Sequence, residues 1–183
     1  MIKRSLSFVL AAAVAAVLSS PAGAQTLDGK AAFQKLKGLA GTWSGPIGSA
    51  TGPTGRISYE VISGGSVVME VLFPGEAHEM RSMYHLDKGD LIMTHYCSGG
   101  TQPHMRLSKT ASTPDKLVFD FDGGTNFDVN KDSFIHNGEI RFLPDGRMEA
   151  SWTSWANGKS AGANHFFALS REMCTSMTLV CGS

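Results

Sequence analysis

Apolar and polar residues alternate with a period of two along most of the chain beyond residue 43. This alternation is typical of β-strands that bury one face, and clusters of Gly, Pro, Asn and Asp separate the segments. With the segment around Trp43, the pattern predicts about ten short strands, the arrangement of an all-β antiparallel sandwich or barrel. The predicted ranges are 56–62, 66–73, 77–86, 91–97, 102–109, 117–122, 133–143, 148–155 and 164–171.

We favour an up-and-down barrel over an open sheet, because closure leaves no strand edge unpaired. A barrel of about ten strands is too wide for its own side chains to fill, so it would enclose a cavity.

One segment before these strands follows a helical period instead. Ala32, Phe33, Leu36 and Leu39 recur at helical spacing, Asp28 is placed to cap the first turn, and Gly41 is the expected stop. The sequence therefore predicts one short helix ahead of the first strand.

The first 24 residues have the features of a secretory signal peptide. A basic start is followed by an apolar run and by Ala22-Gly23-Ala24, a small-residue cleavage site. The apolar run is too short to span a membrane. We expect residues 1–24 to be removed, leaving a single barrel domain over 25–173, a tail over 174–183, and a periplasmic or secreted location.

The charge balance excludes two classes of partner. The full chain has 16 basic and 16 acidic residues, and loss of Lys3 and Arg4 with the leader leaves a slight acidic excess. Such a surface attracts neither nucleic acid nor an anionic membrane. We therefore expect no nucleic-acid binding, no membrane insertion, and a monomer.

Three cysteines, Cys97, Cys174 and Cys181, leave an odd thiol in an oxidising compartment. Pairing of Cys174 with Cys181 is the simplest arrangement, and pairing of Cys97 with Cys174 is its main rival.

The stretch from Met83 to Cys97, "MYHLDKGDLIMTHYC", reads as a hairpin centred on Lys88-Gly89. That centre places Tyr84 opposite Met93 and Ser82 opposite His95 on one surface, with Tyr96 beside Arg81 on the other. The first surface is the more apolar, so we assign it to the barrel interior, although a slip of one residue would reverse the assignment.

The candidate ligand-binding residues follow from this assignment and from the neighbouring strands. A few polar groups in a mostly apolar pocket are typical of a small-molecule site. The interior candidates are Tyr84, Met93, His95, Cys97 and Trp152, with Gln102 and Asn126 nearer the barrel mouth.

Other interpretations of these residues stay open. His95 and Cys97 could form a nucleophile pair, but the sequence indicates no third catalytic group to complete such a site. His104 and His78 could converge on the same pair to bind a metal. The plainest interpretation is an interior histidine with its hydrogen bonds made and a cysteine acting as a small apolar residue. The stretch from Asp120 to Asp128 lacks the spacing of a calcium loop and favours a Gly-Gly hairpin turn.

Two segments carry a family resemblance. "LKGLAGTWSG", with Gly41-Thr42-Trp43, resembles the opening of the calycin barrels, the lipocalins and fatty-acid-binding proteins, and "HFFALSR" supplies Arg171 where those families pack an Arg across the Trp. "MYHLDKGDLIMTHYCSGGTQPHMRL" and "FDFDGGTNFD" resemble a group of exported bacterial lipocalin-like proteins. A looser likeness to the nitrobindin type of haem barrel would make His165 the proximal haem ligand.

Together these observations predict an exported barrel that reversibly binds a small, largely apolar ligand without a cofactor and without catalysis. The alternatives are a haem- or metal-binding barrel with a redox role, and a small hydrolase or isomerase on the same fold, because one fold hosts many functions.

Overall fold

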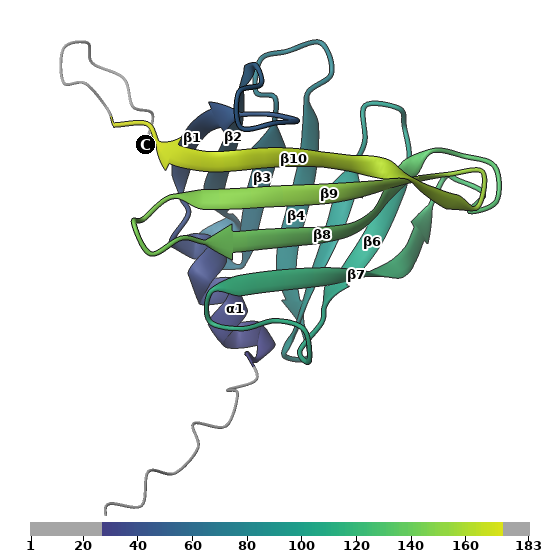
Figure 1. The fold of residues 1–183 in the computed structure, drawn as a ribbon. Helices are drawn as coiled ribbons and strands as arrows, with labels where there is room; N and C mark the ends of the chain where they lie inside the picture. Colours follow the sequence, from purple (N-terminus) through teal and green to yellow (C-terminus); the bar gives the residue numbers. More distant parts are fainter. Residues whose placement is uncertain (1–26, 174–183) are drawn as a thin grey trace, which may run out of the picture.

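The computed structural model describes residues 27–173. Ten antiparallel strands close into one up-and-down barrel, with a single α-helix at one end (Figure 1). This confirms the predicted fold class. The proposed signal peptide, the tail, Cys174 and Cys181 lie outside the described residues.

Each strand pairs with the next along the chain, and β10 returns to pair with β1. The strands are β1 (Gly41–Pro46), β2 (Thr54–Ile62), β3 (Val67–Leu72), β4 (Met80–Asp87), β5 (Asp90–Tyr96), β6 (Gln102–Leu107), β7 (Lys116–Thr125), β8 (Phe134–Phe142), β9 (Met148–Ala156) and β10 (Lys159–Arg171).

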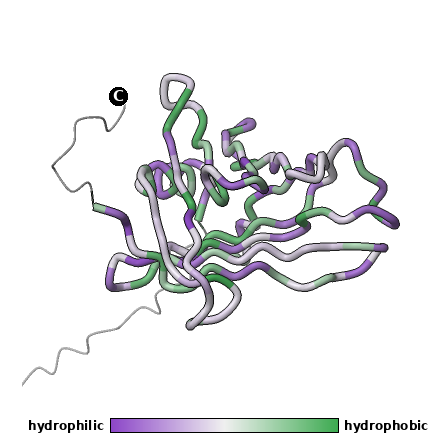
Figure 2. Tube along the Cα trace, turned by 90° about the horizontal axis from the view of Figure 1, so that it is seen from above, coloured by the Kyte–Doolittle hydropathy of each residue, from purple (hydrophilic) through white to green (hydrophobic). Residues whose placement is uncertain are grey.

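Alternation along the strands separates the core from the solvent. Figure 2 shows short hydrophobic and hydrophilic stretches following one another along the strands. In β9, Met148, Ala150 and Trp152 are buried, while Glu149 and Ser151 between them are only partly covered. The inward positions of the other strands join them in one continuous core inside the barrel.

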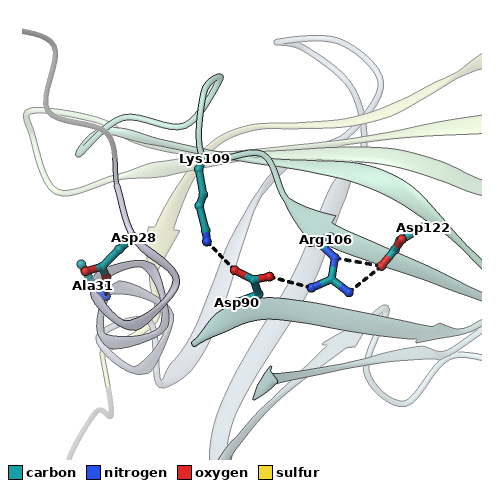
Figure 3. Close-up of polar contacts among 6 residues, drawn as sticks. All are labelled: Asp28, Ala31, Asp90, Arg106, Lys109 and Asp122. Atoms are coloured by element: carbon teal, nitrogen blue, oxygen red, sulfur yellow. Dashed lines mark hydrogen bonds and ion pairs between the residues drawn. The ribbon is translucent and has the colours of Figure 1, made fainter. Parts of the chain in front are cut away.

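The helix α1 (Gly29–Lys37) closes one end of the barrel. The Asp28 carboxylate accepts a hydrogen bond from the Ala31 backbone N–H at 2.7 Å, which is the expected N-cap (Figure 3). The face that carries Ala32, Phe33 and Leu36 is buried. At Gly29 the helix meets the β4–β5 turn so closely that a Cβ would lie 2.3 Å from the Gly89 carbonyl oxygen.

Three boundaries differ from the predicted ones. The helix ends at Gly38 rather than at Gly41, which instead begins β1 with a φ of 124°. Gly123 and Gly124 do not form a hairpin turn but lie inside β7, beside a register shift against β6. Glycine permits such an irregularity because positive φ costs it little. β10 begins directly after Gly158 and is longer than predicted.

The first and last strands meet at Trp43 and Arg171, as the sequence predicts. The two residues are register partners, and the guanidinium carbon lies 4.5 Å from the centre of the indole ring. The Trp43 indole N–H donates to the Leu39 carbonyl at 2.8 Å, and Arg171 donates to the carbonyls of Gly38 and Ala40. These contacts join the end of α1, the start of β1 and the end of β10.

An ion-pair network lies near α1 at the ends of β5, β6 and β7 (Figure 3). Arg106 contacts Asp90 at 3.0 Å and Asp122 at 2.9 Å, and Lys109 also contacts Asp90. Lys109 first, and then Arg106, hold the pKa of Asp90 below its ordinary value. Because these side chains are well exposed, the network adds little stability.

Candidate binding site in the barrel interior

A row of polar side chains crosses the inner wall of β2, β3, β4 and β5. Tyr59 opposes Glu70, Glu70 opposes Ser82, and Ser82 opposes His95, so the four residues sit at one level of the barrel. All four are buried. Register therefore brings together four polar groups that are distant in the sequence, in a wall that is otherwise apolar.

Glu70 is the centre of this row, with none of its surface exposed. The Tyr59 hydroxyl donates to Oε1 at 2.8 Å, and the Tyr84 hydroxyl donates to Oε2 at 3.1 Å. Burial raises the pKa of Glu70, and the hydrogen bonds from Tyr59, Ser82 and Tyr84 oppose that rise. Burial, and then the neighbouring carboxylate, raise the pKa of both tyrosines well above its ordinary value.

His95 continues the row into the interior. Its Nδ1 lies 3.0 Å from the Ser82 hydroxyl, and its side chain is 1% exposed. Burial lowers the pKa of His95 to about 4, so the imidazole is neutral at neutral pH. Nε2 is buried and has no hydrogen-bond partner among the described residues.

Two further buried polar atoms have no partner among the described residues, the hydroxyl oxygen of Thr101, just before β6, and the indole N–H of Trp152. Trp152 packs over Gly138 on β8, where a Cβ would overlap its ring. Phe119 stands between Tyr84 and Trp152, with ring centres 5.5 Å and 6.4 Å away respectively. The interior thus combines aromatic and aliphatic walls with two polar atoms whose bonding capacity is unused.

The hairpin register predicted for the stretch from Met83 to Cys97 is confirmed. Tyr84 opposes Met93 and Ser82 opposes His95, and all four side chains are buried. Tyr96 opposes Arg81 on the outer face and is 48% exposed.

The remaining candidates lie at the end of the barrel opposite α1. Cys97 is half-buried in the β5–β6 turn, and Gly99 donates its N–H to the Cys97 sulfur at 3.4 Å. The side-chain amides of Gln102 and Asn126 both donate to the Gly100 carbonyl at 2.6 Å. These two amides therefore hold the turn against the end of β7, which leaves less of their bonding capacity for a ligand.

The same open end carries a cluster of aromatic rings from β7, β8, β9 and the β7–β8 loop. Phe121 stacks on His136 at 4.5 Å between ring centres, and His136 stacks on Trp155 at 4.1 Å. Phe127 and Phe134 complete the cluster. These rings lie at the end of the barrel opposite the one that α1 covers.

The histidine proposed as a haem ligand faces outward. His165 opposes Ser151 on the outer side of β9, whereas its neighbour Phe166 is buried opposite Ala150. The His165 ring stacks on Phe167 and borders an outer hollow of about 280 Å³. The family likeness therefore assigns the haem to a residue that does not line the barrel interior.

The histidines considered for a metal site also do not converge. His104 opposes Thr94 on the outer face, and His78 lies before β4, with its ring tilted against Phe73 and its Nε2 3.5 Å from Glu76. Within residues 27–173, no three His, Cys, Asp or Glu side chains are grouped to hold an ion. Cys97 has no disulfide partner in that range.

Our sequence reasoning missed Glu70 and Tyr59. A signal was present, because Glu70 shares the inward face of "VVMEVL" with Val68 and Leu72. A single acidic residue at a core position of an apolar strand is rarely buried without a partner. That rule would have directed attention to the tyrosines of the neighbouring strands.

The chain matches no protein-family model, and no curated protein matches it. None of the described helices is long and apolar enough to cross a membrane. The interpretation of the site therefore depends on its geometry and chemistry.

Proposed function

We propose that this protein is an exported barrel that reversibly binds one small, largely apolar molecule in its interior. The observation that carries the proposal is that His95 Nε2 and Trp152 Nε1 are buried without a hydrogen-bond partner among the described residues, as is the Thr101 hydroxyl oxygen just before β6. Leaving such an atom without a hydrogen bond costs roughly 1–3 kcal/mol. A ligand that bonds to them would recover that cost while its apolar body contacts Met93, Phe119 and the other core side chains.

The architecture supports the proposal. An interior of about eight strands is just wide enough to be filled by side chains or to hold one small ligand, and the interior widens as strands are added. This barrel has ten strands and is covered by α1 at one end. The hollow of about 310 Å³ beside Met83 and Tyr96 lies on the outer surface, so the proposal does not depend on it.

Binding explains the site better than acid–base catalysis does. A general base works best when its pKa lies near the working pH. Burial lowers the pKa of His95 to about 4, which makes it a weak base at neutral pH. Cys97 lies in a turn beyond the strand, in contact with the Gly99 N–H, and no bond joins it to His95.

The test uses the uncharged fluorescent probe N-phenyl-1-naphthylamine and two matched variants. Met93 faces the interior, whereas Met83 faces outward beside the surface hollow. We expect saturable binding of one probe per barrel. Met93→Ala should change the dissociation constant at least threefold, and Met83→Ala should leave it unchanged.

Two results would contradict the proposal. One is the absence of saturable binding to folded protein, with folding verified by near-ultraviolet circular dichroism. The other is sensitivity to Met83→Ala without sensitivity to Met93→Ala, which would place the probe on the outer surface.

A further inference from the structure

The buried ionisable side chains of the described barrel include a carboxyl group but no lysine or arginine. Glu70 and His95 are the ionisable side chains found among the buried polar residues, apart from the core tyrosines. Every Lys and Arg in residues 27–173 is exposed or half-buried. The described interior therefore offers no cation to a ligand.

Glu70 is not free to bind a ligand either. Each of its two carboxyl oxygens accepts a hydrogen bond from a tyrosine hydroxyl, and Ser82 lies at the same level. On the inner wall, the groups left for a ligand are one nitrogen of the neutral His95 imidazole and the Trp152 indole N–H; the third buried atom without a partner among the described residues, the Thr101 hydroxyl oxygen, lies just before β6. The imidazole nitrogen donates or accepts according to its tautomer, whereas the indole nitrogen only donates.

From this arrangement we propose that the interior selects an uncharged apolar molecule bearing a hydroxyl group, such as an alkylphenol or a long-chain alcohol, over the corresponding carboxylate. This inference rests on the proposed binding function and adds the class of ligand. A hydroxyl both donates and accepts, so it can bond to His95 Nε2 in either tautomer, and it has the acceptor that the Trp152 indole N–H needs.

Charged ligands fit this site poorly. A buried carboxylate loses its hydration and needs a cation or several donors in return. Here it would find a single fixed donor, and no lysine or arginine is among the buried described residues. An ammonium cannot bond to the indole N–H, and each Glu70 oxygen already accepts one hydrogen bond from a tyrosine hydroxyl.

The experiment measures displacement of N-phenyl-1-naphthylamine at pH 7 by ligands that share one octylphenyl body. The set comprises 4-octylphenol, 4-octylbenzoate, 4-octylbenzylamine and octylbenzene. A phenol with a pKa of about 10 is neutral at this pH, whereas a carboxyl with a pKa of about 4 is ionised. We expect 4-octylphenol to bind at least tenfold more tightly than each of the other three.

Variants test whether His95 Nε2 and Trp152 Nε1 cause the preference for 4-octylphenol. His95→Leu and Trp152→Phe should each reduce the advantage of 4-octylphenol over octylbenzene to threefold or less. His95→Gln retains a donor and an acceptor and should preserve the advantage. His104→Gln, on the outer face, is the control and should behave as the unmodified protein.

Each outcome has a distinct meaning. If octylbenzene or 4-octylbenzoate binds as tightly as 4-octylphenol, the hydroxyl preference is wrong while binding of apolar molecules stands. If the preference survives both His95→Leu and Trp152→Phe, the assigned atoms are wrong. If neither the probe nor any of the four compounds binds, both this inference and the proposed function fail.

Discussion

Glu70 has a role in stability that can be separated from ligand binding. Its carboxyl is buried and hydrogen-bonded to two phenols, yet no Lys or Arg is buried with it in the described interior. Burial therefore outweighs the hydrogen bonds and raises the pKa of Glu70. A raised pKa means that the folded state holds this proton more tightly than the unfolded chain does.

The first prediction follows from that sign. As the pH rises through the ordinary range of a carboxyl group, the unfolded chain loses the Glu70 proton first, so folding becomes less favourable until the folded state also ionises. Glu70→Gln removes this titration. The free energy of unfolding of Glu70→Gln, relative to that of the unmodified protein, should rise between about pH 4 and about pH 8. Urea denaturation at the two pH values measures it.

The control for this prediction is Glu60→Gln, because Glu60 is exposed on the outer face of β2. It removes a carboxyl group without touching the buried row, so it should not reproduce the rise expected for Glu70→Gln. A constant difference for Glu70→Gln would show that Glu70 titrates normally in the fold.

His95 gives a second prediction of opposite sign. Its pKa falls from 6.5 to about 4 on burial, so the unfolded chain takes up this proton first as the pH drops. The free energy of unfolding should fall by roughly 3 kcal/mol across that window, at about 1.36 kcal/mol per pKa unit. His95→Gln should reduce this loss of stability at acid pH, whereas His104→Gln should not. An equal loss of stability at acid pH in all three proteins would show that His95 does not cause it.

Among the structural elements, the closing contact between β1 and β10 has the largest expected energetic weight. Trp43 is buried, stacked by Arg171 and bonded to the end of α1. Trp43→Ala should therefore lower the free energy of unfolding by about 3–5 kcal/mol. Tyr96→Ala, at an exposed outer position, should cost less than about 0.5 kcal/mol. Similar urea midpoints for the two variants would argue against a large contribution of the Trp43 contact to stability.

The contact between α1 and the β4–β5 turn gives a fourth prediction. Alanine usually favours a helix over glycine, by up to about 1 kcal/mol. At Gly29, however, a Cβ would meet the Gly89 carbonyl oxygen and the Leu91 backbone nitrogen. Gly29→Ala should therefore destabilise the protein despite the gain in propensity, while Lys30→Ala on the exposed side should not. A Gly29→Ala variant with an unchanged or higher thermal midpoint would mean that α1 can move away from the turn.

Local sequence pattern predicts the strands of this barrel and the register of one hairpin, but not the contacts between more distant strands. Alternation located the strands, and the turn Lys88-Gly89 was enough to place Ser82 opposite His95. The Lys88-Gly89 turn could not place Glu70 opposite Tyr59, because that contact depends on the register of β2 with β3, a different strand pair. Local pattern also misplaced the hairpin turn at Gly123-Gly124, since glycine pairs serve both turns and strand irregularities.

Considered as a whole molecule, the barrel has two unlike ends. One is covered by α1 and crossed by the Arg171 contacts, and the other is rimmed by aromatic rings and by the turn held at Gly100. The site residues predicted from sequence divide accordingly. Tyr84, Met93, His95 and Trp152 lie in the buried interior, whereas Cys97, Gln102 and Asn126 lie towards the open rim.

The signal peptide predicted from the sequence gives the fifth prediction. The apolar run followed by Ala22-Gly23-Ala24 predicts cleavage after Ala24. Protein recovered from the exported fraction should begin at Gln25, and its intact mass should lack residues 1–24. A recovered mass that retains the leader would contradict cleavage at this site.

The closing contact also dictates when the fold can be completed. Arg171 reaches back to the carbonyls of Gly38 and Ala40, and β10 is the strand that pairs with the free edge of β1. A ribosome adds roughly 5–20 residues per second, so the first strand waits several seconds for its last neighbour. Until β10 arrives, the nascent chain is an open sheet with an unpaired edge and an uncovered apolar face. The barrel can therefore close only after the whole of β10 has been synthesised, so the order of the chain delays completion of the fold until almost all of it is made.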